Sequence, residues 1–146
     1  MPLKFSFIFL GQSVLRYKAS KDIVDEVNSI YETRKAKKTM FHMRDDLLGK
    51  IYNEYSLFSA SQKDGAKDHN HNFLSNNILD FFKQTIKHYL EWNRIKEYTS
   101  RINSVWVNDM KAGEYNPAHV HLGDLYTGLS SVMFLKIPKS YGKEWT

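Results

Sequence analysis

The residues with the clearest chemical potential lie in AHVHLGD, residues 118 to 124, where one residue separates His119 from His121. In an extended strand, residues i and i+2 project from the same face, so the two imidazoles would be able to bind one ion. Imidazole binds iron, zinc, copper and nickel, and one further ligand would complete a facial triad with positions open for substrate. Asp124 is the nearest carboxylate, and a turn at Gly123 could bring it back toward the pair. The spacing predicts a metal site; ordinary surface residues near a turn are the alternative.

Four other histidines are less informative. His69 and His71, in DHNHN, repeat the same spacing inside a polar stretch without a strand signal, which shows how easily the pattern arises. His42 and His88 are isolated, and we interpret them as helix-surface or partly buried residues. The metal hypothesis therefore depends on the pair at 119 and 121.

Two amphipathic helices are expected in the first two thirds of the chain. Apolar residues recur at helical spacing over residues 21–35, after Ser20, which can cap a helix. A second apolar face runs over residues 75–92, with Ser75 or Asn76 as its cap.

Strand signals lie at both ends of the chain. Residues 4–17 read as one or two strands around Gly11, and residues 101–110 and 129–138 are rich in β-branched and aromatic residues. The polar residues 59–72 are expected to form a loop. A short helical face is expected from a group of apolar residues before that loop: Leu47, Leu48, Ile51, Tyr52 and Tyr55. Helices before strands indicate an α+β fold rather than a parallel βαβ sheet.

Composition restricts the kinds of protein that this chain can be. The 146 residues fit one domain, residues 1–146, and 42% hydrophobic residues argue against wholesale disorder. Cysteine is absent, which excludes disulfides, thiolate nucleophiles and Cys-type zinc sites. No apolar run approaches the roughly 20 residues of a membrane span, and the N-terminal FSFIFLG reads as a strand rather than a signal peptide. We therefore expect a cytoplasmic protein without a membrane partner.

The net charge of +5 leaves an anionic partner open. The densest basic stretch, residues 34–38, falls where the first helix should end, a position that suits cations. Because the other lysines are scattered, nucleic-acid binding is not indicated.

The stretch from residue 104 to 138 resembles a family of phage and bacterial proteins assigned to the 2-oxoglutarate- and Fe(II)-dependent oxygenases. The family pattern is a Trp-x-Asn strand, a glycine-containing loop, His-x-His-Pro-Gly, a Ser-Gly step and a strand ending near Tyr-Leu-x-x-Pro. The matching positions are Trp106, Asn108, Gly113, His119, His121, Gly123, Thr127, Gly128, Phe134, Leu135 and Pro138. The resemblance extends more loosely over the N-terminal strand and helices.

This resemblance implies a double-stranded β-helix core, of the jelly-roll or cupin-like kind, with N-terminal helices. It implies Fe(II) and 2-oxoglutarate as cofactors, with His119 and His121 as metal ligands. Asn108 would face the site from a neighbouring strand and Phe134 would form a wall of the pocket, both near the cosubstrate. In such enzymes three side chains hold the iron and 2-oxoglutarate chelates it, while the protein supplies ligand geometry, a dry pocket and an anion clamp.

The sequence departs from the family pattern in ways that affect function. Leu122 replaces a proline, and Phe134 replaces a tyrosine, so the hydroxyl that the resemblance implies near the cosubstrate is missing. His121 stands where the wider superfamily has a carboxylate, so the ligand pair is either His119 with His121 or one of them with Asp124. After Pro138 no distal histidine and no anion clamp follow. We therefore expect a fold incomplete at its C-terminus, from truncation of a longer protein.

Two functions follow from these features. The first is a hydroxylase-type oxygenase acting on an unknown small-molecule or protein substrate. The alternative is a catalytically inactive or truncated jelly-roll module with a binding or structural role. In either case bare strand edges favour association into a homo-oligomer.

Overall fold

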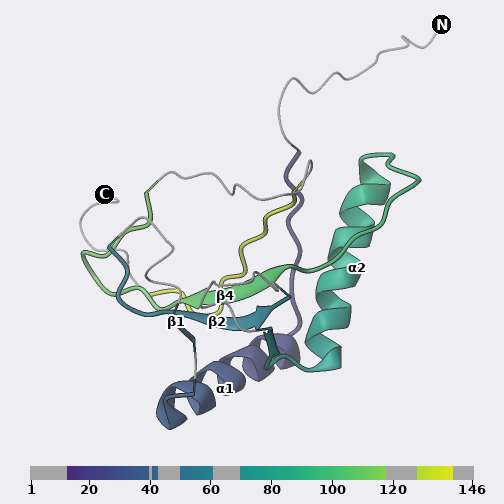
Figure 1. The fold of residues 1–146 in the computed structure, drawn as a ribbon. Coiled ribbons are helices and arrows are strands. Elements are labelled where there is room, and N and C mark those ends of the chain that lie inside the picture. Colours follow the sequence, from purple (N-terminus) through teal and green to yellow (C-terminus); the bar gives the residue numbers. More distant parts are fainter. Residues whose placement is uncertain (1–12, 40, 43–49, 61–69, 118–127, 140–146) are drawn as a thin grey trace, which may run out of the picture.

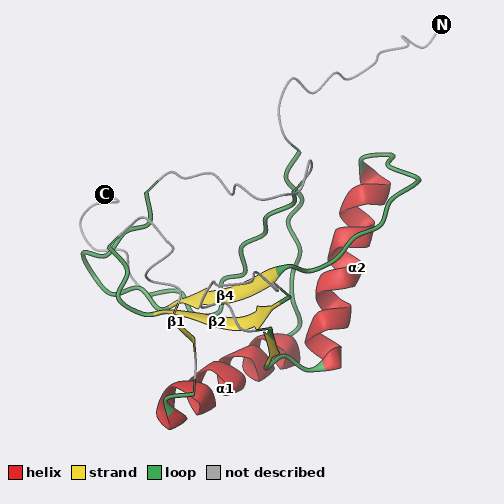
Figure 2. Cartoon of the chain, in the orientation of Figure 1, coloured by secondary structure: helices red, strands yellow, loops and turns green. Residues whose placement is uncertain are grey.

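The structure, a computed structural model, describes residues 13–39, 41–42, 50–60, 70–117 and 128–139. Within these ranges the chain forms two helices and a small antiparallel sheet (Figures 1 and 2). The elements in chain order are α1 (Lys21–Lys37), β1 (Phe41–His42), β2 (Glu54–Ser59), β3 (His71–Asn72), α2 (Asn76–Trp92) and β4 (Ser104–Asn108). The predicted α+β class is confirmed.

Local sequence accounts for both ends of α1. The Ser20 side chain accepts a hydrogen bond from the backbone N–H of Ile23, at 3.4 Å, and so caps the first turn. At the other end Lys38 adopts a left-handed conformation, with φ of 53°, and its N–H bonds back into the last turn. The buried residues lie at helical spacing: Ile23, Val27 and Tyr31. The helix predicted over residues 21–35 is confirmed, and it continues for two more residues.

The second predicted helix is also confirmed. Ser75 caps α2 by accepting a hydrogen bond from the Ile78 N–H at 3.2 Å. Ile78 and Leu90 are the buried residues of this helix, and the chain reverses after it at Arg94, which has a φ of 60°. α1 and α2 approach each other near their N-termini, where the Asn77 amide donates to the Glu26 carboxylate at 3.0 Å.

β2 is the central strand of the sheet. β4 runs antiparallel along one edge, from Asn108 opposite Glu54 to Ser104 opposite Ser59. β1 and β3 are short and pair with β2 antiparallel. Because β4 occupies the whole of one edge, β1 and β3 lie along the other, as Figure 1 shows.

An irregularity in β2 places Leu57 in the core. Ser56 pairs with Trp106 and Phe58 pairs with Val105, so Leu57 is an extra residue in β2, as in a β-bulge. The bulge lets Leu57 and Phe58 both reach the side of the sheet that the helices cover. Leu57 is fully buried there, with 0% of its surface exposed.

The core lies between the two helices and one face of the sheet. Its buried cluster consists of Val27, Leu57, Leu74 and Ile78. Partly buried residues packed against it include Val105 and Val107 of β4 and Leu135 from the C-terminal segment. The helices therefore cover the face of the sheet that carries the two valines.

One expectation for the middle of the chain is wrong, and a second is wrong at its ends, since residues 61–69 lie outside the described residues. The short helical face expected from Leu47 to Tyr55 is not a helix where the structure describes it: Lys50 forms an antiparallel bridge with Tyr115, and Tyr55 belongs to β2. The loop expected over residues 59–72 includes strand residues at both ends, Ser59 in β2 and His71–Asn72 in β3. In both cases pairing with distant parts of the chain decided the conformation.

The strand expected over residues 129–138 is also wrong, since residues 128–139 are described without strand structure. Of the N-terminal strands expected over residues 4–17, only 13–17 are described. They are not strand, and they run beside α2, where the Tyr17 hydroxyl lies 2.9 Å from Nδ1 of His88. The sheet is thus a single open layer in the described part of the chain.

Candidate functional site

The predicted metal ligands His119 and His121, and Asp124 beside them, lie outside the described residues. The structure does fix the chain that leads to them. β4 ends at Asn108, a turn follows, and Tyr115 pairs with Lys50 through two backbone hydrogen bonds of 3.0 and 3.2 Å. The segment that carries the His-x-His pattern therefore begins close to the end of the sheet where β4 stops.

The sheet face opposite the helices is rich in polar groups. Side chains alternate along a strand, and cross-strand partners share a face. Val105 and Val107 of β4 face the core, so Ser104, Trp106 and Asn108 point away from the helices. Their partners across the sheet follow from the observed register. We call this surface the polar face, and it consists of Phe41, Glu54, Ser56, Ser59, His71, Ser104, Trp106 and Asn108.

The polar groups of β2 are buried on this face. Glu54 is 3% exposed, Ser56 1% and Ser59 7%. Burying a carboxylate is costly unless hydrogen bonds or opposite charges compensate it, so such a residue is often tied to function. The sequence carried a signal for this, because Glu54 and Ser56 alternate with the apolar Tyr55 and Leu57. That alternation was missed because the spacing of the preceding apolar residues favoured a helix.

His71 is part of the polar face, not of a loop. Its Nε2 is hydrogen-bonded to Ser56 Oγ at 2.9 Å. Its ring centroid lies 4.5 Å from that of Phe41 and 5.1 Å from that of Phe73. These contacts fix the imidazole, but the 1% exposure of Ser56 leaves its hydroxyl out of reach of a substrate. The pair is therefore better suited to positioning than to nucleophilic catalysis.

The two predicted cosubstrate residues differ in their surroundings. Asn108 lies on the polar face at the end of β4, exposed and directly opposite Glu54. Phe134 lies outside any strand and is 74% exposed, whereas its neighbour Leu135 packs against the core. The structure therefore brings Asn108 together with the buried carboxylate but does not bring Phe134 into the same cluster.

Trp106, a matching position of the resemblance, lies on the polar face opposite Ser56, whereas the isolated residues His42 and His88 lie away from that face. Tyr115 is 58% exposed and Trp106 is half-buried on the polar face. His42 is exposed in β1 with its ring centroid 4.4 Å from that of Tyr55, and His88 lies on α2. Tyr126 and His69 lie outside the described residues.

Ligand types suited to iron are present on the polar face, namely the Glu54 carboxylate and the His71 imidazole. In the ranges that the structure describes, no group of three His, Asp or Glu side chains is close enough to hold a metal ion. A complete metal centre would thus need at least one group from the rest of the chain, such as His119 or His121.

A charged network anchors the end of β4 to α1. Asp109 accepts hydrogen bonds from the Tyr31 hydroxyl at 2.7 Å and from the Lys35 ammonium at 2.6 Å. The bond from Lys35, followed by that from Tyr31, lowers the pKa of Asp109 below its ordinary value of 3.8. Burial, followed by the bond to Asp109, raises the pKa of the Tyr31 hydroxyl. The network fixes the residue directly after Asn108 and so holds this end of the polar face in place.

Asp109→Ala is expected to lower the free energy of unfolding by about 1–2 kcal/mol, because the buried Tyr31 hydroxyl loses its acceptor and Asp109 is only partly exposed. The lowered pKa means that the contribution is present above the unfolded carboxyl pKa and is lost as pH falls through the folded pKa. The difference between the wild-type and variant urea midpoints should therefore be full at pH 7 and shrink below about pH 4.

The matched control is Asp80→Ala. It removes an i,i+3 ion pair with Lys83 in which the Asp80 side chain is 63% exposed, and it should cost less than about 0.5 kcal/mol. Equal effects of the two substitutions, or a gap that widens in acid, would contradict the role given to Asp109.

Comparison with known proteins adds no further assignment: no family model, no curated protein and no solved structure matches the chain.

Among the described residues, neither α1 nor α2 has both the length and the apolar content needed to cross a membrane.

Proposed function

We propose that this chain is a non-haem oxygenase that uses Fe(II) and 2-oxoglutarate to hydroxylate a substrate still to be identified. The observation that supports it most is the polar face, where a buried carboxylate and Asn108 lie opposite each other on the side of the sheet away from the helices. Tyr115, four residues before His119 in the sequence, pairs with Lys50 at the same end of the sheet. In the proposed fold, a jelly roll, a second sheet would face this surface and the pocket would lie between the two sheets.

The proposed metal ligands are His119 and His121 with one further group. The sequence suggested Asp124, and the polar face adds Glu54 and His71, whose donor types suit Fe(II). Glu54 lies on the central strand and is held in place by the sheet, so it would offer a rigid ligand.

The other residues of the proposed site would orient the cosubstrate or shape the pocket rather than bind the metal. The Asn108 amide can donate a hydrogen bond to a carboxylate of 2-oxoglutarate or to a metal ligand. Trp106, on the same face, would keep water from the pocket. When bound, Fe(II) and 2-oxoglutarate would supply the oxidising chemistry, which the side chains of the chain lack.

The direct test is anaerobic titration of the purified chain with Fe(II) and 2-oxoglutarate. A complete site is expected to give a weak visible charge-transfer band that needs both components and disappears when a chelator is added. Titration with Zn(II) and 2-oxoglutarate is the control and should give no band, since Zn(II) has a filled d shell.

A second candidate function is a catalytically inactive jelly-roll module. It is favoured by one observation, that Phe134, which stands at the tyrosine position of the family pattern, lies outside any strand and is 74% exposed. Absence of the band together with absence of retained iron would favour this module and would overturn the oxygenase proposal.

A further inference from the structure

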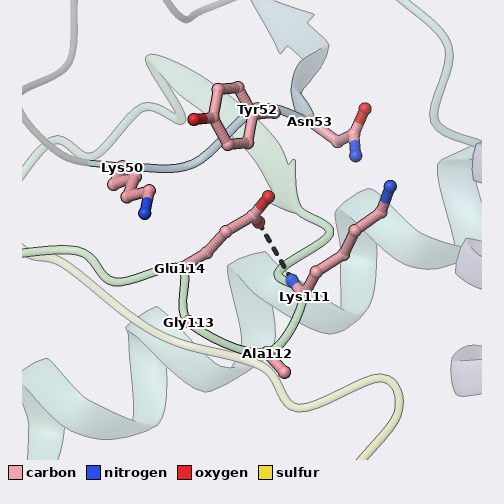
Figure 3. Close-up of a pocket in the computed structure, with 7 residues that line it drawn as sticks. All are labelled: Lys50, Tyr52, Asn53, Lys111, Ala112, Gly113 and Glu114. Atoms are coloured by element: carbon pink, nitrogen blue, oxygen red, sulfur yellow. Dashed lines mark hydrogen bonds between the residues drawn. The ribbon is translucent and has the colours of Figure 1, made fainter.

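A hollow of about 420 Å³ lies at the end of the sheet where β2 begins and β4 stops. Lys50, Tyr52 and Asn53, which lead into β2, form one wall. Residues 111–114, in the turn after β4, form the other, as Figure 3 shows. The iron proposal makes no use of this hollow.

Backbone hydrogen bonds hold the two walls at a fixed separation. Lys50 and Tyr115 exchange two of them, and the Asp109 N–H donates to the Asn53 carbonyl at 2.9 Å. Within the turn, the Glu114 N–H donates to the Lys111 carbonyl at 3.0 Å. A ligand would therefore meet a preformed hollow and would not have to order it, which favours affinity.

The turn leaves its backbone open to an approaching group. Gly113 has a φ of 80°, a left-handed conformation that favours glycine. A Cβ atom at this position would have no neighbouring atom within 4 Å, so the space beside the Gly113 backbone is open. The Gly113 amide is thus a suitable reporter for anything that enters the hollow.

The charges that line the hollow come from both walls. Lys50 and Lys111 each contribute an ammonium group, and in the described part of the chain neither forms an ion pair. The Glu114 carboxylate accepts a hydrogen bond from the Lys111 backbone N–H at 2.9 Å, and in Figure 3 it lies between the two ammonium groups. Two positive charges and one negative charge leave the lining with a net charge of +1.

We propose that this hollow binds the carboxylate group of a small-molecule ligand through the ammonium groups of Lys50 and Lys111, which lie on either side of Glu114. A singly charged carboxylate matches the net charge of the lining, whereas a phosphate dianion would carry excess charge toward Glu114. Asn53 supplies a neutral amide that can bond the rest of the ligand. The site is formed by described residues alone, so it stands whether or not the chain binds iron.

The test is a titration of ¹⁵N-labelled protein with sodium acetate, followed by amide NMR, with chloride adjusted to keep ionic strength constant. The Gly113 and Lys111 amide signals are expected to shift in a saturable way, without added metal. Inorganic phosphate, titrated in the same way, is expected to bind more weakly. Tighter binding of phosphate than of acetate would overturn the carboxylate assignment.

Three variants make the test specific. Lys50→Gln and Lys111→Gln should each weaken acetate binding about threefold to tenfold, as expected for loss of one nearby charge at a surface site. Glu114→Gln keeps an acceptor for the Lys111 N–H but removes the negative charge, so it should strengthen binding by a similar factor. Lys83→Gln on α2, far along the chain from the hollow, is the control and should leave binding unchanged.

Amide spectra of each variant also report whether the fold is intact. Absence of a saturable shift at Gly113 in the wild-type protein would overturn the proposal, as would shifts that persist unchanged in both lysine variants. Because these titrations contain no metal, their result is independent of the iron titration.

Discussion

Iron uptake is expected to be lost when His119 and His121 are both replaced by alanine. Loss of a hydrogen-bonding partner behind a metal ligand commonly weakens metal binding about 10- to 100-fold, and loss of two ligands should exceed this range. The measurement is equilibrium dialysis against Fe(II) under anaerobic conditions. His88→Ala is the control, since His88 lies on α2, where it contacts Tyr17. Iron uptake that survives the double substitution would place the metal elsewhere and contradict the proposed ligand pair.

The same measurement identifies the third ligand. Glu54→Gln, Asp124→Asn and His71→Asn each remove one candidate while keeping a polar side chain of similar size. The variant whose iron uptake falls with that of the histidine pair marks the ligand. Because Glu54 is buried, its substitution also needs a check of the folded state by circular dichroism, so that loss of iron is not confused with loss of structure.

The largest effect on stability is expected at the centre of the core. Ile78→Ala should lower the free energy of unfolding by about 2–5 kcal/mol, because Ile78 is 0% exposed and its removal leaves a cavity among Val27, Leu57 and Leu74. Ile78→Val, which removes one methylene, should cost only about 0.5–1.5 kcal/mol. Both values are measured by urea unfolding followed by circular dichroism.

The matched control for this prediction is Phe134→Ala. Phe134 is 74% exposed, so its truncation should change stability by no more than about 0.5 kcal/mol. A cost for Phe134→Ala comparable to that for Ile78→Ala would show that Phe134 is packed in solution. That result would contradict the exposed position that the structure gives it.

Only part of the candidate site could be predicted from the sequence. Residue type and spacing suggested His119 and His121, whereas the family resemblance suggested Asn108, which lies on the face away from the helices. Glu54, Ser56 and His71 were not selected, since their shared face is created by the pairing of β2 with β3 and β4. A face shared by residues that lie far apart in the sequence depends on register, and no single segment encodes it.

The sequence by itself determined the two helices and β4. Each of the helices carries its own cap, Ser20 or Ser75, and an apolar stripe at helical spacing, and these are local features that act within about four residues. Tertiary structure alone decided that Tyr55 and Ser59 belong to a central strand, that a bulge sends Leu57 into the core, and that residues 128–139 lie outside the sheet. The physical reason is that a helix forms its hydrogen bonds within one segment, whereas a strand must find them on a distant partner.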